Sequence, residues 1–213
     1  MNLFKKSFGE NQSKSDEDRQ GINSKDATTH INLGIALKNS GDFEGAISEY
    51  RQAIRINPEL ADAHFNLGFA LGVKGDLEGA ISEYRQAIRI SPELAGSHYN
   101  LGVALGAKGD FEGAISEYRQ AIRINPELAG SHYNLGVALE AKGDLEGAIS
   151  EWRQAIRINP KYAEAHNNLG TALYTKGDLE GAISEYRQAI RINPKDARAH
   201  DNLEIALHAK GDL

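Results

Sequence analysis

Apolar and small residues recur with helical spacing along most of this chain. From residue 61 onward, His64, Leu67 and Leu71 lie at positions i, i+3 and i+7, which share one face of an α-helix. Gly68, at i+4, adds a small residue to the same face. A second stripe runs through residues 80–88, where Ala, Ile, Tyr, Ala and Ile are interspersed with polar residues. The two stripes predict two amphipathic helices that pack against each other.

The residues between and after these stripes indicate where the helices end. Gly75 supplies the left-handed conformation that often ends a helix, and Asp76 is a favoured N-cap for the next one. Pro92 cannot continue a helix and disfavours helical geometry at Ser91. We therefore expect a helix, a tight turn, a second helix and a second turn between residues 61 and 94.

This arrangement repeats every 34 residues. The tripeptide Asn-Leu-Gly stands at the same place in each of five complete units, and Asn-Leu-Glu replaces it in a final half-unit. A fixed period of this length indicates a repeat array, in which neighbouring units cover each other's apolar faces. The units are residues 27–60, 61–94, 95–128, 129–162 and 163–196, followed by the half-unit 197–213.

The two ends of the chain differ from the complete units. Residues 1–26 are mostly polar and cannot bury enough surface to offset their ordering entropy, so we expect a disordered tail. The half-unit has nothing after it to cover its helix, and it carries Glu204 where the other units have Gly. These features predict a capping helix. Because Gly211 to Leu213 would begin a second helix, a sequence that continues further is the alternative.

The third unit carries Leu101-Gly102, Leu105, Ala114, Tyr118, Ala121 and Pro126 at positions 7–8, 11, 20, 24, 27 and 32. This set of positions resembles the tetratricopeptide repeat (TPR) family, and the resemblance extends over residues 27–213. One departure is systematic, because His stands at position 4, where the family has Trp or Tyr. The resemblance implies an all-α fold, a right-handed α-solenoid of helix-turn-helix repeats whose first helices line a concave groove. It also implies that this groove binds proteins or peptides without catalysis.

Composition and charge narrow the function further. The formal net charge of −6 argues against a nucleic-acid partner, because such proteins usually present a basic surface. No stretch reaches the roughly 18–20 apolar residues of a membrane span, and the N-terminus has no apolar core of a secretory signal. We therefore expect a cytoplasmic protein. The repeats offer no nucleophile–base pair or phosphate loop, so we expect neither enzymatic activity nor a cofactor.

Position 4 carries the only set of residues that resembles metal ligands. Successive histidines lie on helices one whole repeat apart, so they cannot share a zinc ion, whose ligands lie at about 2 Å. We expect them to pack within each repeat and to make folding sensitive to acid. Arginine and glutamate are interleaved on the second helices, and we assign them to a solvated convex face, with phosphate binding as the alternative. The histidines are His30, His64, His98, His132, His166 and His200, and the glutamates are Glu49, Glu83, Glu117, Glu151 and Glu185.

Position 6 of the first helix is Asn in every unit. Asn is a mediocre helix former, so its recurrence suggests an offsetting contact, and its amide suits the backbone of an extended peptide. The row is similar to the asparagine ladder in the repeats of O-linked N-acetylglucosamine transferases, which implies a grip on a substrate backbone. The alternative is that Asn only fills the rim of the groove. The ladder consists of Asn32, Asn66, Asn100, Asn134 and Asn168, with Asn202 in the half-unit.

Positions 5 and 9 lie on the same stripe and vary between units, whereas the second helices are almost identical. A uniform framework with variable groove positions is the pattern expected for partner-specific recognition. In addition, an exposed apolar strip usually marks an interaction site. Position 5 carries no cation, so we do not expect the carboxylate clamp of chaperone-binding TPR domains. The candidate partner-binding residues, besides the asparagines, are Phe65, Phe69, Tyr99, Val103, Tyr133 and Val137.

Two functions of different classes fit these features. The first is a non-catalytic adaptor that holds a peptide or helix of a partner protein in its concave groove. The second is a self-assembling structural protein whose N-terminal tail docks into the groove of the same or another copy. Leu3, Phe4 and Phe8 would supply the apolar contacts, and Lys5 and Lys6 suit an acidic protein.

Overall fold

The computed structural model describes residues 25–212, which contain α-helices and no strands. The helix that covers residues 25–39 already includes Lys25 and Asp26, two residues that we had assigned to the tail. The rest of the tail prediction concerns residues outside the described part of the chain. No helix in the described part is long and apolar enough to cross a membrane, and the cytoplasmic location stays a prediction.

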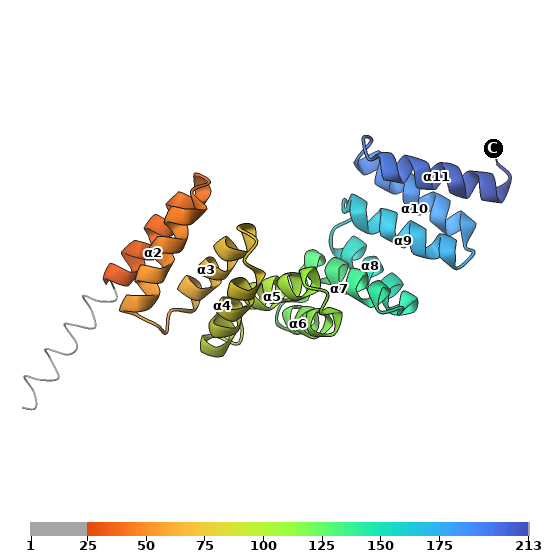
Figure 1. Cartoon of the computed structure of the whole chain (residues 1–213). Coiled ribbons are helices and arrows are strands. Elements are labelled where there is room, and N and C mark those ends of the chain that lie inside the picture. The colour runs from red at the N-terminus through yellow and green to blue at the C-terminus, as the bar shows by residue number, and fades with distance from the viewer. Residues whose placement is uncertain (1–24, 213) are drawn as a thin grey trace, which may run out of the picture. The chain divides into compact units, whose positions relative to one another are not determined.

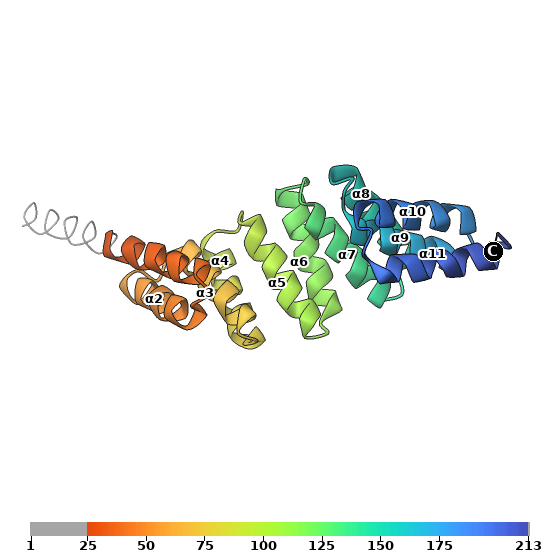
Figure 2. The same ribbon diagram turned by 90° about the horizontal axis from the view of Figure 1, so that it is seen from above.

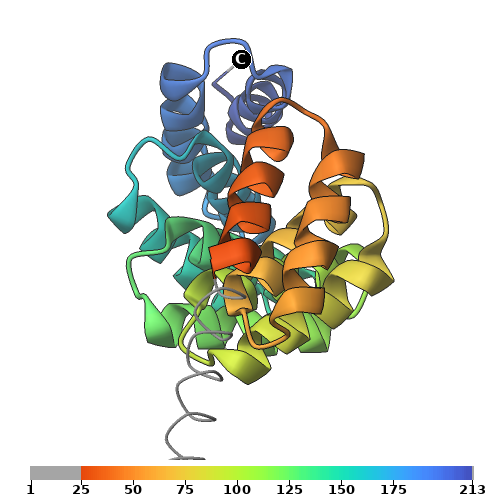
Figure 3. The ribbon, with the colours of Figure 1, turned by 90° about the vertical axis from the view of Figure 1, so that its left-hand side faces the viewer.

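The chain is divided into two compact units, residues 1–100 and 101–213. Each 34-residue module of the sequence is called a repeat, to distinguish it from these two units. The first unit, described from residue 25, pairs the 25–39 helix with α2 and α3 with α4. Figure 3 shows the 25–39 helix and α2 side by side. Its helices are residues 25–39, α2 (Phe43–Ile56), α3 (Ala61–Val73), α4 (Leu77–Ile90) and the start of α5 (Ala95–Ala107).

The second unit contains the rest of α5 and six further helices. Within it α7 pairs with α8 and α9 with α10, and α11 packs on α10 (Figure 1). Figure 2 shows α9, α10 and α11 as neighbours. This packing confirms the predicted fold of successive helix pairs. The helices are α6 (Phe111–Ile124), α7 (Ala129–Ala141), α8 (Leu145–Ile158), α9 (Ala163–Thr175), α10 (Leu179–Ile192) and α11 (Ala197–Lys210).

The turn between the helices of a pair forms where the sequence predicts it. Gly75 has φ of +85°, a conformation that residues with a side chain rarely adopt. Asp76 then caps α4, because its side chain accepts a hydrogen bond of 2.9 Å from the backbone N–H of Gly79. The start of α4 and its pairing with α3 therefore depend on the Gly-Asp dipeptide, which the other repeats share.

Within a repeat, the two helices meet where Gly at position 8 faces the aromatic residue at position 24. A Cβ atom added to Gly102 would lie 2.7 Å from Cε1 of Tyr118, closer than real Cβ contacts allow. The same holds for Gly136, whose added Cβ would lie 2.5 Å from Nε1 of Trp152. The aromatic ring at position 24 is thus the nearest neighbour of the glycine in both repeats.

Successive repeats are joined by a buried leucine and by exposed ion pairs. Leu67 at position 7 is 3% exposed, whereas Leu33 at the same position of the first repeat is 47% exposed, since no described helix precedes it. Lys74 forms an ion pair with Glu44 of the preceding repeat at 2.8 Å. Neighbouring repeats thus share an apolar interface whose outer edge is charged.

Candidate peptide-binding groove

The predicted groove residues lie on the exposed side of the first helices. Phe69 and Val103 are 38% and 41% exposed, and Phe65, Tyr99, Tyr133 and Val137 are half-buried. We call this surface, made of positions 2, 5, 6, 9, 12 and 13 of each first helix, the groove face. Tyr99 and Asn100 end the first unit, so each unit carries its own part of the groove face.

In the second unit, three predicted residues meet around one hollow of about 220 Å³. Gly106 keeps it open, because a Cβ added there would have Ala114 Cβ at 3.8 Å as its nearest neighbour. The walls therefore combine apolar side chains with a single amide. We call it the Val103 hollow, and its main lining residues are Val103, Gly106, Phe111, Tyr118, Asn134 and Val137.

In the first unit, two asparagines of the predicted ladder line another hollow, of about 510 Å³. Ile31 and Ile35, at positions 5 and 9, provide part of its apolar surface together with Leu60 and Leu94. The sequence-based candidates did not include Ile31 and Ile35, although they occupy the positions of Phe65 and Phe69 one repeat earlier. The two asparagines are Asn32 and Asn66.

Several asparagine amides of the ladder are already engaged within the chain. Asn66 donates to the Asp62 carbonyl at 2.8 Å, and its Oδ1 accepts from Lys38 Nζ at 3.3 Å. Asn168 donates to the Tyr133 hydroxyl at 3.4 Å. A peptide that uses these amides must therefore replace such contacts or bind to the acceptor sites that remain.

Two of the predicted aromatic residues also take part in packing. The ring of Tyr133 lies 4.8 Å from that of Tyr162 between centroids, and burial raises the pKa of Tyr133. Phe65 lies 6.1 Å from the ring of Tyr84, which belongs to the core. Truncating Tyr133 would therefore disturb local packing as well as the groove face. Phe69, with Lys38 Nζ 5.4 Å from its ring centroid, is the more purely superficial residue.

In three repeats the position-4 histidine links the two helices of its own repeat to the turn that closes the preceding repeat. In the second repeat, Nδ1 of His64 lies 2.6 Å from Oε2 of Glu83, and Nε2 lies 3.0 Å from the carbonyl oxygen of Pro58. His132 and His166 make the same pair of contacts. Within the described residues no group of three or more histidine, cysteine or acidic side chains could hold a metal ion.

These contacts correct the assignment of the interleaved glutamates to a solvated face. The Glu83 side chain is only 23% exposed, because it turns toward His64 rather than into solvent. The sequence contains a signal for this pairing, since a glutamate follows the position-4 histidine by 19 residues in every complete repeat. The spacing joins two helices, so it falls outside the local periodicity that defines helical faces.

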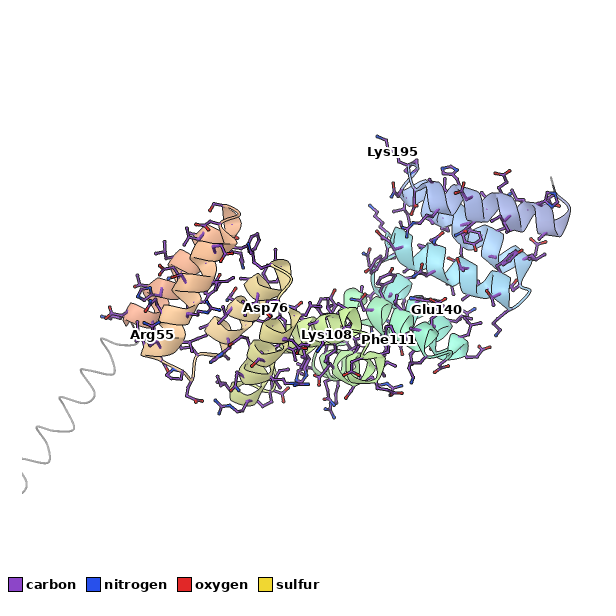
Figure 4. All side chains as sticks on the ribbon, in the orientation of Figure 1. Arg55, Asp76, Lys108, Phe111, Glu140 and Lys195 are labelled. Carbon is purple, nitrogen blue, oxygen red and sulfur yellow. The ribbon has the colours of Figure 1, made fainter. Side chains whose placement is uncertain are left out.

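The second unit also carries acidic side chains that were not among the sequence-based candidates for the groove. Within residues 101–212, Glu140, Glu164, Asp201 and Glu204 have no ion-pair partner, and Figure 4 shows Glu140 on α7. Burial raises the pKa of Glu140, so this carboxylate is partly removed from water. Asp201 and Glu204 line a third hollow of about 450 Å³, together with Tyr174.

Comparisons with known proteins agree with this architecture. A family model described as "TPR repeat" matches residues 36–72, 73–109, 104–143, 141–177 and 170–211. A comparison with curated proteins found no match.

Three similar solved structures illustrate the range of the likeness. MamA protein is 26% identical, with a TM-score of 0.72 over 81% of this chain and 94% of that one. YrrB, described as a TPR protein with an unusual peptide-binding site, is 25% identical, with a TM-score of 0.71 over 98% of both chains. PilF of Pseudomonas aeruginosa, at 22% identity and a TM-score of 0.80 over 89% of this chain and 86% of that one, shares the fold alone.

Proposed function

Because this chain belongs to the tetratricopeptide repeat family, we propose that it is a non-catalytic scaffold whose groove face binds a segment of a partner protein. The Val103 hollow is the observation that carries the proposal. It joins exposed Val103, half-buried Val137 and the amide of Asn134 in one concave site. YrrB, a structure of similar fold, is described as having a peptide-binding site, which supports the same use here.

Binding would combine one apolar anchor with contacts to the peptide backbone. A leucine-sized side chain that enters the Val103 hollow would gain about 1.5–3 kcal/mol from burial. Asn134 lies on the wall of the hollow and belongs to the asparagine row, whose amides have both donors and acceptors. The similarity to the asparagine ladder of O-linked N-acetylglucosamine transferases would then reflect a shared way of holding peptide backbones.

A test of this proposal fills the hollow without disturbing the core. In Gly106→Leu the new side chain would occupy the hollow, since the added Cβ meets Ala114 at an ordinary contact distance of 3.8 Å. Proteins captured by wild type and variant would be identified by mass spectrometry. Ser116→Leu, which adds leucine at an exposed site on α6, is the control. The proposal requires partners that Ser116→Leu retains and Gly106→Leu loses; an identical set in all three overturns it.

Self-association through the N-terminal segment is the second candidate function. The unpaired acids of the second unit, such as Glu140 and Glu164, suit the cations Lys5 and Lys6, and Leu3 would supply an apolar contact. The mass of the full chain measured by light scattering would then rise with concentration, and deletion of residues 1–24 would abolish that rise. An unchanged concentration dependence after the deletion excludes this function.

A further inference from the structure

We propose that the groove face of residues 101–213 selects partner segments that combine an apolar anchor with lysine or arginine side chains. This inference rests on the proposed function and specifies the chemistry of its partner. Two independent features support it. One is the apolar Val103 hollow, and the other is the distribution of paired and unpaired carboxylates over the second unit.

Several glutamates on the second helices of this unit are paired with basic side chains of the chain. Glu112 at the start of α6 pairs with Lys142 at 2.7 Å, and Glu180 at the start of α10 pairs with Lys210 at 2.8 Å. Glu151 on α8 contacts His132 at 2.6 Å. These glutamates of the second helices therefore already have basic partners within the chain.

The first helices of the same unit leave their acids without cations. Glu140 at position 12 and Glu164 at position 2 both act electrostatically on Tyr133, which places them around one groove residue. Arg198 acts on Tyr133 as well, but its guanidinium already lies 3.3 Å from Asp196. Two carboxylates without an ion-pair partner thus act on Tyr133, whereas Arg198 is paired with Asp196.

The acidic surface continues to the last helix. Asp201 and Glu204 line the 450 Å³ hollow together with Tyr174, Ile205 and His208. Ile205 is 54% exposed, so apolar and acidic groups are adjacent here too. On the groove face of residues 101–212, the three acids Glu140, Glu164 and Asp201 stand beside two basic side chains, Arg198 and His208.

Such a surface favours a cationic and apolar ligand over an acidic one. A carboxylate beside the low-dielectric protein, such as Glu140 on α7, gains more from an opposite charge than one in bulk water. An apolar side chain in the Val103 hollow would hold the segment in place, while lysine or arginine side chains reach the acids of α7, α9 and α11. Acidic segments would meet like charges and be rejected.

The selection experiment uses the full chain and a random peptide library displayed on phage. Peptides that bind wild type are counter-selected on Gly106→Leu, so that only ligands of the Val103 hollow remain. We expect the surviving sequences to share an apolar residue and an excess of lysine and arginine over the starting library. Survivors of neutral or acidic composition overturn the inference while leaving the proposed function intact. A library without any Gly106-dependent binder overturns both.

A matched pair of variants then locates the charge effect. Glu140→Gln, Glu164→Gln and Asp201→Asn together remove three groove-side charges. The control set changes the net charge equally but on the second helices. Affinity of the selected peptide should fall about ten-fold with the groove set, and about 0.5 M salt should weaken wild-type binding similarly. Equal affinities for the two sets refute the charge inference. The control set is Glu112→Gln, Glu146→Gln and Glu180→Gln.

Discussion

His64 and Glu83 form a partly buried contact in which Nδ1 of the imidazole lies 2.6 Å from Oε2 of the carboxylate. The other ring nitrogen of His64 faces the Pro58 carbonyl at 3.0 Å, so both nitrogens point at acceptors. Only the protonated imidazolium has two N–H donors to satisfy both. The hydrogen bond to Glu83 accordingly raises the pKa of His64, and it prevails over burial, which acts in the opposite direction.

Stability should therefore decrease as the pH rises above neutrality. A group whose pKa is raised in the folded state stabilises the protein fully below its unfolded pKa of about 6.5, and the gain is lost as the pH passes the folded value. Burial opposes the charge of His166, but its hydrogen bonds to Glu185 and Pro160 outweigh burial and raise its pKa too. We therefore expect the urea concentration at the midpoint of unfolding to decrease as the pH is raised from about 6 to about 9.

This expected dependence is opposite in sign to the sequence-based expectation that acid would weaken the fold. Replacing both His64 and His166 by Gln provides the control, because glutamine does not titrate in this range. The double variant should show a smaller change of midpoint with pH than wild type. An equal slope in the two proteins would show that these histidines do not carry the effect.

Removal of a single glutamate partner should destabilise the repeat. Glu83→Gln replaces a charge-assisted hydrogen bond with a neutral one, and we expect a loss of about 1–3 kcal/mol in the free energy of unfolding near pH 6. Glu44→Gln is the control, since its ion pair with Lys74 lies on a surface where Glu44 is 73% exposed. That variant should change stability by less than about 1 kcal/mol. Equal effects in urea denaturation contradict the special role of Glu83.

Replacing two glycines on α5 by alanine should change the stability of the protein in opposite directions. Gly102→Ala places a Cβ 2.7 Å from Tyr118 Cε1, and overpacking of this kind costs about 1–3 kcal/mol. Gly106→Ala meets only an ordinary contact at 3.8 Å, so the better helix propensity of alanine should stabilise by about 0.5–1 kcal/mol. Thermal melting compares the two. If Tyr118→Leu fails to relieve the Gly102→Ala defect in a double-mutant cycle, the ring is not its cause.

The leucine at position 7 should contribute less to stability in the first repeat than in the second. Leu67 is 3% exposed at the interface with the preceding repeat, and Leu67→Ala should cost about 2–5 kcal/mol. Leu33 is 47% exposed at the equivalent position, so Leu33→Ala should cost less than about 1 kcal/mol. Chemical denaturation of both variants gives the comparison. A large loss at Leu33 would show that another segment covers it in solution.

Local pattern was sufficient to predict the helix pairs and their turns. The spacing of Leu67 and Leu71 gives the buried face, and Gly75 with Asp76 gives the turn, because each depends only on neighbours in sequence. Contacts between helices were harder to predict. Glu83 was misassigned because its partner lies on the other helix of the pair, 19 residues before it.

The groove face was predicted only in part for a similar reason. Periodicity placed Val103 and Val137 on the correct stripe, and the structure brings both to one hollow with Asn134. It did not reveal that Tyr133 packs on Tyr162, since that contact joins a helix to the turn before the next repeat. The unpaired state of Glu140 was also hidden, because pairing depends on which side chains reach each other in space.

Position 12 of the first helix, where Gly106 opens the Val103 hollow, has one further consequence. This site carries a different residue in most repeats, while the buried contacts beneath it hardly change. A substitution there alters the shape and charge of the surface but leaves the helix pairing intact. Ligand preference can therefore evolve, or be engineered, one repeat at a time without a loss of foldability. The residues at this site are Lys38, Gly72, Gly106, Glu140, Tyr174 and His208.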